Sequence, residues 1–142
     1  MSFLRQVLAA LALTGVCGLG LAAQSPKSQW DGVYTDAQAA RGEPFYRENC
    51  SMCHGLNLAG TVLAPALAGP AFAGKWNRRP LATVFDIMRT QMPLNLSGHL
   101  SDQQNADVLA YMLQVGGMPA GASELPGRVE VLKAITIIER KP

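Results

Sequence analysis

The sequence predicts an all-α fold in which three helices are joined by long loops. Apolar residues recur at the i, i+3, i+4, i+7 spacing of a buried helical face in residues 81–88 and again in residues 108–115. Two of the three helical segments also begin with Ser or Thr followed three residues later by Gln, the pattern of a capped helix start. A chain of 142 residues without a visible internal repeat fits one small domain.

The N-terminal segment has the pattern of an export signal. It carries one positive charge at Arg5, an apolar stretch from Val7 through Leu21 and small residues at its end. We therefore expect residues 1–23 to be a secretory signal peptide and the mature protein to be periplasmic. The apolar part is shorter than the roughly 20 residues of a membrane span, so membrane contact is expected only if this segment is retained. Cys17 lies inside the segment and is expected to be lost with it.

The first helix is expected to begin at a capping box formed by Thr35 and Gln38 and to deliver Cys50 at its end. Pro44 falls inside this helix. Because proline removes a backbone donor, we expect it to kink the helix or to split it into two pieces. The preceding residues 24–34 contain turn formers without a helical period and are expected to form an extended arm.

Two further helices are expected in the second half of the chain. Residues 55–79 are rich in Gly and Pro, which predicts a long irregular loop able to wrap a ligand. Pro80 suits the start of a helix that should stop before Pro93. Ser101 and Gln104 form a second capping box, and the helix that follows should end at a pair of glycines.

We place a single domain at residues 35–125 and interpret residues 126–142 as a C-terminal strap, either a short strand or an extended segment, because Val and Ile partly alternate there. Hydrophobic residues make up 49% of the chain and aromatic residues only 6%, so a small core would gain from a large apolar prosthetic group. The net charge of +2 and the scattered basic residues argue against nucleic acid as a partner. Most charges are expected to be solvated, and their one expected use is the docking of a protein partner.

The sequence Cys50-Ser51-Met52-Cys53-His54 predicts one covalently attached haem c. The two thiols are three residues apart and can form thioethers with two vinyl groups, while His54 can bind the iron. A structural zinc site would need a fourth ligand, for which only His99 offers a nitrogen. A thiol oxidoreductase would carry its two cysteines beside a β-α-β pattern, which is not visible here. Both alternatives are therefore less favoured.

A six-coordinate iron needs a second strong ligand on its opposite face. The candidates are Met88, Met92, His99, Met112 and Met118. Met92 is the best placed, because it stands at the end of a helix just before Pro93, where the chain turns. Met88 and Met112 lie on apolar helical stripes and are expected to pack in the core.

Taken in order, these motifs resemble the class I cytochrome c family over Thr35 to Leu125. Gly42 and Tyr46 are similar to positions of the family's N-terminal helix, where a glycine eight residues before the first haem cysteine lets another helix approach closely. Residues 106–111 resemble the C-terminal helix that crosses it. The resemblance implies orthogonal helices packed around one covalently bound haem.

The resemblance also implies roles for several residues outside the haem motif. Pro65 occupies the place of a proline whose carbonyl accepts a hydrogen bond from the ligand histidine, and Leu67 would pack on the haem. Trp76 resembles a tryptophan that often donates to a haem propionate, with plain core packing as the alternative. Arg78 and Arg79 could face the propionates as well, although solvation at the surface is the favoured interpretation.

We therefore expect an electron-transfer protein rather than an enzyme. Residues 30–34 and 119–121 are similar to segments of small periplasmic cytochromes that accept electrons from quinoprotein or molybdenum dehydrogenases. The expected partners are such a dehydrogenase as donor and a cytochrome or oxidase as acceptor. Two alternatives stay open: a haem-based ligand-binding or peroxidase-like protein, and a tightly bound cytochrome subunit of a dehydrogenase complex.

Overall fold

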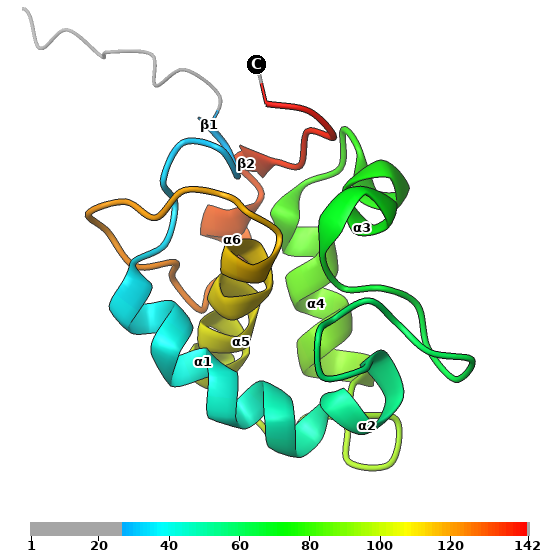
Figure 1. Ribbon diagram of the computed structural model, residues 1–142. Helices are drawn as coiled ribbons and strands as arrows, with labels where there is room; N and C mark the ends of the chain where they lie inside the picture. Colours follow the sequence, from blue (N-terminus) through cyan, green and yellow to red (C-terminus); the bar gives the residue numbers. More distant parts are fainter. Residues whose placement is uncertain (1–26, 142) are drawn as a thin grey trace, which may run out of the picture.

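The computed structural model describes residues 27–141 (Figure 1). The segment expected to be a signal peptide and the first residues of the expected arm lie outside this range. The described part contains these elements: β1 (Lys27–Ser28), α1 (Asp36–Asn49), α2 (Ser51–His54), α3 (Gly69–Trp76), α4 (Leu81–Gln91), α5 (Asp102–Val115), α6 (Val129–Leu132) and β2 (Ile135–Thr136). The expectation of an all-α fold with long loops is confirmed, since the strands have only two residues each.

Helices α1 and α5 make the most extensive contact between any two elements of the described chain. Gly42 of α1 lies against the backbone of α5, where a Cβ atom would overlap the carbonyl group of Asp107. On the same side of α1, the rings of Tyr46 and Tyr111 lie 5.6 Å apart. The close approach predicted for Gly42 is therefore present in the structure, and it fixes the direction in which α1 carries Cys50 toward the rest of the molecule.

The two predicted caps have different outcomes. At the start of α5, Gln104 N donates to Ser101 Oγ and Ser101 N donates to Gln104 Oε1, which confirms the capping box. At the start of α1, Gln38 N donates to Thr35 Oγ1, but the Gln38 side chain does not return to the cap. It is buried and exchanges two hydrogen bonds with the backbone of Leu125 instead. A tertiary contact has replaced the local one.

Two expectations about helix boundaries need correction. Helix α1 runs from Asp36 to Asn49 through Pro44, so the chain is not split into two pieces there, and packing on α5 supports both halves. The region 55–79 is not irregular throughout, because α3 occupies Gly69–Trp76. Gly69 has a φ of +73° and Pro70 follows it in the first turn, so this Gly-Pro pair starts a helix rather than interrupting one.

The two ends of the described chain are joined to each other. Strand β1 pairs in parallel with β2, and the isolated bridge between Pro80 and Thr136 adds the start of α4 to the same region. Gln29 is buried and bonds through its side chain to the backbone of Ile138 in both directions, while Trp30 Nε1 donates to the same carbonyl group. The segment expected as a strap thus contains a short helix and a short strand.

Apolar side chains of α1, α4, α5 and the tail form one core. Figure 1 shows α5 behind α1 and beside α4, with α2, α3 and their connecting loop on the opposite side of α4 from α6. None of the helices in residues 27–141 combines the length and apolarity needed to cross a membrane. The space between α2, α4 and α5 is where the predicted site residues gather.

Candidate functional site

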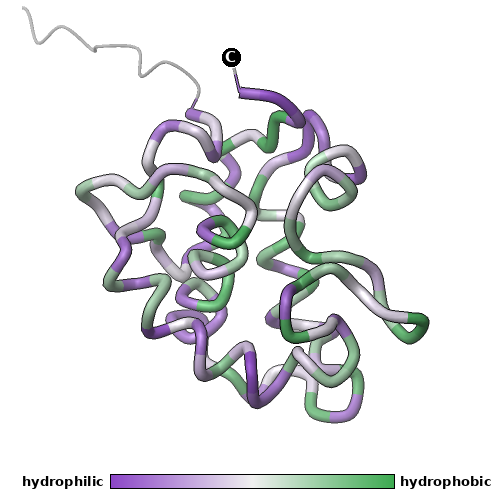
Figure 2. The backbone as a smooth tube through the Cα atoms, in the orientation of Figure 1, coloured by the Kyte–Doolittle hydropathy of each residue, from purple (hydrophilic) through white to green (hydrophobic). Residues whose placement is uncertain are grey.

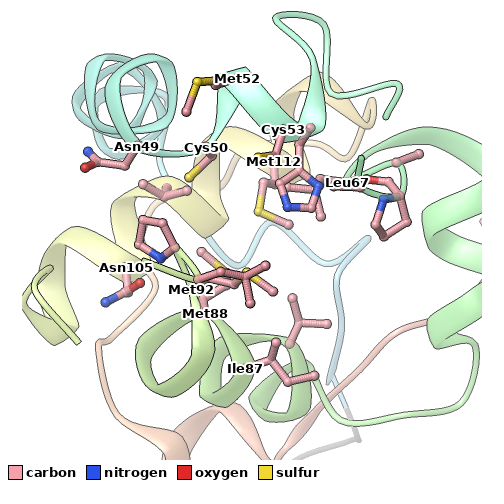
Figure 3. Close-up of a pocket in the computed structure, with 18 of the residues that line it drawn as sticks. Asn49, Cys50, Met52, Cys53, Leu67, Ile87, Met88, Met92, Asn105 and Met112 are labelled. Atoms are coloured by element: carbon pink, nitrogen blue, oxygen red, sulfur yellow. Dashed lines mark hydrogen bonds between the residues drawn. The ribbon is translucent and has the colours of Figure 1, made fainter. Parts of the chain in front are cut away.

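A cavity of about 370 Å³ lies between α2, α4, α5 and two loops, the loop 55–68 and the loop 92–101 (Figure 3). Figure 3 shows Cys50 and Cys53 on one side of this cavity and Met88 and Met92 on the other. Its wall is mostly apolar. The predicted site residues that line it are Cys50, Cys53, His54, Pro65, Leu67, Trp76 and Met92.

The haem motif is held in place by backbone hydrogen bonds at the end of α1. Cys50 N donates to the carbonyl of Tyr46, and the carbonyl of Cys50 accepts from the amides of Cys53 and His54, so that α2 turns both thiols to the cavity. Both thiols are free. Burial, with a smaller contribution from Cys53, raises the pKa of the Cys50 thiol to about 11. A thiol that stays protonated at neutral pH is a poor redox nucleophile, which disfavours a thiol oxidoreductase.

His54 is oriented by a hydrogen bond from its Nδ1 atom to the carbonyl oxygen of Pro65, over 2.8 Å. Because a carbonyl can only accept, Nδ1 carries the proton, and in the neutral imidazole Nε2 keeps its lone pair. His54 is buried and lines the cavity. Such a hydrogen bond fixes the tautomer and ring orientation of a histidine and strengthens it as a metal ligand.

The loop 55–68 owes its shape to contacts with its own residues and with α1. Tyr46 Oη donates to the carbonyl of Gly55, and Gly60 N donates to the carbonyl of His54. Gly60 has a φ of +81°, and a Cβ atom there would press on the backbone of Pro65 and Ala66. The fully buried Leu58 anchors the loop in the core. These contacts bring Pro65 to the histidine eleven residues before it.

Three of the five ligand candidates line the cavity: Met88, Met92 and Met112. Met92 forms the C-cap of α4, where its amide donates to the carbonyl of Met88. Met88 and Met112, expected to be core residues, pack against the core and also face the cavity. The spacing of apolar residues in the sequence could not reveal that these methionines face the cavity, because a helix face that packs in the core and one that packs on a cofactor have the same periodicity.

The remaining two candidates lie elsewhere. Met118 is buried outside the cavity, and its carbonyl accepts from Tyr34 Oη. His99 is exposed, with Nδ1 at 2.9 Å from the carbonyl of Leu96 and Nε2 at 2.9 Å from Asn49 Oδ1. In the described part of the chain no three His, Cys, Asp or Glu residues are grouped as a metal site would require, so His99 does not complete a zinc site.

The polar side chains of the cavity are few. Trp76 lies at the end of α3, packs against Phe72, and has Lys75 Nζ 5.2 Å from its ring; its Nε1 atom has no hydrogen-bond partner among residues 27–141. Lys75 itself lines the cavity, which the sequence analysis missed, whereas Arg78 and Arg79 do not. The sequence offered one indication that Lys75 lies at the site, because it directly precedes Trp76, which was itself a predicted site residue.

Asn105 is a second residue that the sequence analysis missed. It is buried in α5, lines the cavity, and its Nδ2 atom donates to the carbonyls of Leu100 and Ser101. These carbonyls end the loop 92–101 that begins with Met92. Asn105 therefore fastens the far end of that loop to α5.

The residues present fit a haem. Two thiols, a histidine with its Nε2 lone pair available and a thioether all face one apolar cavity, and the indole of Trp76 lies at its border. Cys50 and Cys53 would hold the porphyrin covalently, and His54 would bind its iron. Among residues 27–141, Glu48 and Lys75 are the only Asp, Glu, Lys or Arg residues that line the cavity, so its wall carries little charge.

Comparison with known proteins places this arrangement among haem proteins. Residues 37–112, more than half of the chain, match the family model described as cytochrome C oxidase, cbb3-type, subunit III. The chain is 31% identical over 105 residues to a thiosulfate dehydrogenase of Allochromatium vinosum, covering 69% of this chain and 36% of the relative. It is 32% identical over 77 residues to a thiosulfate dehydrogenase of Psychrobacter arcticus, covering 49% of this chain and 24% of the relative.

A solved structure is also similar. The crystal structure of the sulfane dehydrogenase SoxCD from Paracoccus pantotrophus superposes with a TM-score of 0.49 at 24% identity, over 63% of this chain and 53% of that one. The chain spans about a third of the length of one curated relative and about a quarter of the other.

Proposed function

This chain belongs to the cytochrome c family, and on that premise we propose that it is a single-electron carrier whose haem c is bound through His54 and Met92. One observation carries the proposal: His54, oriented by Pro65, and the thioether of Met92 line the same apolar cavity as Cys50 and Cys53. With His54 and Met92 both bound to it, the iron would have no open position for a substrate. The reaction is then the transfer of an electron to and from another molecule.

When bound, haem c supplies an iron that changes by one electron between its ferrous and ferric states. The chain's own residues set the conditions for that change. The apolar wall disfavours the additional positive charge of the ferric form, and a neutral thioether favours the ferrous form, so a positive reduction potential is expected. Pro65 keeps the Nδ1 proton of His54 in place during both states.

The proposed partners are a dehydrogenase as electron donor and a cytochrome or oxidase as acceptor, with the exported chain acting in the periplasm. Support comes from two relatives named thiosulfate dehydrogenase, of which this chain resembles only a part. A carrier joined to a larger dehydrogenase, as a subunit or a transient partner, is consistent with that partial match.

Replacing Met92 by Leu tests the second axial ligand. The swap keeps volume and apolarity, so the packing around the cavity should be preserved and the changes below should come from the missing iron ligand. The sulfur-to-ferric-iron charge-transfer band should disappear, the midpoint potential should fall, and carbon monoxide should bind the reduced variant. Visible spectra and potentiometry of the holoprotein measure all three.

The matched controls are Met88→Leu and Met112→Leu, which remove a thioether from the same cavity. Both should keep the band and should not bind carbon monoxide. If the band were lost in one of the controls but kept in Met92→Leu, the methionine replaced in that control would be the iron ligand instead of Met92. Carbon monoxide binding by the wild-type protein would favour the ligand-binding or peroxidase-like alternative.

A second candidate function is catalysis on thiosulfate, favoured by the names of the two curated relatives. With His54 and Met92 bound, the iron would have no open position for thiosulfate, so we expect no turnover. Assays with excess thiosulfate and an external one-electron oxidant measure this. Repeated oxidation of thiosulfate by each molecule of protein, with the oxidant reduced in proportion, would establish the chain as catalytic.

A further inference from the structure

The loop 92–101, in which hydrophilic positions stand among hydrophobic ones (Figure 2), contains two consecutive turns. Leu96 N donates to the carbonyl of Pro93, and His99 N donates to the carbonyl of Leu96. Gly98 occupies the third position of the second turn with a φ of +78°, which glycine adopts without strain. The two hydrogen-bonded turns couple the position of His99 to the start of the loop.

Both ring nitrogens of His99 face oxygen atoms. Nδ1 lies 2.9 Å from the carbonyl oxygen of Leu96, and Nε2 lies 2.9 Å from Oδ1 of Asn49, the residue before Cys50. The Asn49 amide is held in this orientation because its Nδ2 atom donates to the carbonyl of Phe45 over 2.8 Å. A reversed amide would turn its oxygen toward that carbonyl, where no donor is available. The side-chain oxygen of Asn49 therefore stays directed at His99.

Two oxygen acceptors require two donors. A neutral imidazole carries one N–H group, whereas an imidazolium carries two. His99 therefore donates to both oxygen atoms only when both of its ring nitrogens are protonated. This differs from His54, whose Nδ1 atom donates to Pro65 while Nε2 keeps its lone pair. Because a histidine side chain ordinarily changes its charge between about pH 5 and 8, the double contact of His99 depends on pH in that interval.

The charged groups around the loop are paired among themselves or lie apart from the imidazole of His99. Those in the adjoining turns of the neighbouring helices are Arg47 and Glu48 of α1, Asp86 and Arg89 of α4, and Asp102 of α5. Arg89 pairs with both Asp86 and Asp102. Arg47 pairs with Glu43, and in the described part of the chain no carboxylate forms an ion pair with His99. The two oxygen atoms are thus the partners that respond to its protonation.

The contact between His99 and Asn49 joins two sides of the cavity. Figure 3 shows Asn49 beside Cys50, on the side of the cavity opposite Met92. Among the hydrogen bonds of residues 27–141, this one ties the middle of the loop 92–101 to another helix. The segment that begins with Met92 is therefore fastened, through His99, to the end of α1 that carries the first haem cysteine.

We propose that His99, in its doubly protonated form, is a positioning residue that holds the loop 92–101, and with it Met92, against the end of α1; this rests on the proposed function. Loss of one proton leaves one of the two contacts unmade. One hydrogen bond of ordinary strength corresponds to a change of about fivefold in the population of the released loop. Met92 therefore leaves the iron more readily as the pH rises through the range in which histidine loses its charge.

The rate at which azide displaces Met92 in the ferric holoprotein measures this release. Azide stays anionic between about pH 6 and 8, and at saturating azide the departure of the thioether limits the rate. The wild-type rate should rise about fivefold over this interval. In His99→Gln, whose amide has no charge to lose, it should change by less than about twofold. Stopped-flow spectra at the sulfur-to-ferric-iron band give both rates.

Replacing Asn49 tests the other partner of the contact. Asn49→Ala removes the acceptor, so its rate should already be high at about pH 6, and adding His99→Gln should raise it no further. Asn49→Asp supplies a carboxylate, which holds a protonated imidazole more strongly, so the rise in rate should move to higher pH. The matched control is Ser97→Ala, an exposed position in the same loop, which should keep the wild-type pH profile.

Several outcomes would overturn the proposal. One is a wild-type rate that does not change with pH, and another is a rate in His99→Gln that rises as steeply as in wild type. A third is a rise in Asn49→Asp at lower pH than in wild type. The last two would assign the pH dependence to a different titrating group.

Failure of this inference and failure of the proposed function are distinguishable. Amide hydrogen exchange at Leu96 and His99 reports on the loop without reference to the iron. In Asn49→Ala it should be about fivefold faster than in wild type at about pH 6. Equal exchange, with Met92 established as the ligand by Met92→Leu, would refute only the role of His99. A charge-transfer band that persists in Met92→Leu would refute the proposed ligand, while faster exchange would still support the contact.

Discussion

Tyr46 connects the packing of the helices to the chemistry of the site. Its ring packs beside Tyr111 of α5, and its hydroxyl donates over 2.6 Å to the carbonyl of Gly55, the residue after His54. Burial raises the pKa of Tyr46 to about 12, with smaller contributions from Cys50 and Tyr111. One side chain thus holds both the helix crossing and the start of the loop 55–68.

The raised pKa of Tyr46 predicts how the free energy of unfolding changes at alkaline pH. An unfolded tyrosine ionises near pH 10, whereas Tyr46 in the folded protein stays neutral until about pH 12. Its contribution is therefore complete below pH 10 and is lost as the pH rises toward 12. In the holoprotein, the free energy of unfolding should fall over this interval, and the fall should be smaller in Tyr46→Phe. Denaturant unfolding followed by circular dichroism at several pH values measures the difference.

At pH 8 the same substitution should still reduce stability, by about 1 kcal/mol, because the carbonyl of Gly55 loses its donor. A variant whose unfolding free energy declines with pH as steeply as that of wild type would show that another group is responsible. Tyr34, whose pKa burial also raises, is the first such group to replace.

Helices α1 and α5 cross at a place where one backbone touches the other. Gly42 allows this contact, and the buried carboxylate of Asp107 accepts two hydrogen bonds from Arg41 beside it. The crossing places Cys50 and Asn105 on the same cavity. The start of a helix, such as the cap at Ser101, does not by itself determine how α1 and α5 cross.

Replacing Gly42 by Ala tests the crossing. The added methyl group would meet backbone atoms that cannot move aside, so the free energy of unfolding should fall by about 2 kcal/mol or more. Gly74→Ala is the matched control, since it is also a helical glycine but has no heavy atom closer than 3.8 Å to the added carbon. That change should be neutral or stabilise by up to about 1 kcal/mol. Chemical denaturation of both holoproteins gives the comparison, and equal stabilities would contradict the close contact.

At the scale of the whole molecule, contacts join the N-terminal and C-terminal parts of the described chain. Gln29 and Gln38, both fully buried, use their side-chain amides to bind the backbone of Ile138 and Leu125. The residues after α5 thereby run back past α1 to α4, where α6 and β2 make contact (Figure 1).

The sequence by itself determined what depends on neighbours in the chain. The spacing of Cys50, Cys53 and His54, the capping box at Ser101 and the stop before Pro93 all act within one or two helical turns, so they could be predicted from the residues alone. The all-α class followed from the same local periodicity.

Only the tertiary structure decided which distant groups meet. Pro65 reaches His54 because Gly60 and Leu58 fold the loop back, and Gln38 leaves its local cap for a carbonyl 87 residues away. Three of the methionines considered as iron ligands, rather than one, line the cavity. The physical reason is that a residue can form a hydrogen bond or an apolar contact with many different partners, and the residues next to it in the sequence do not indicate which one it will meet. The choice of partner is decided by the packing of the whole chain.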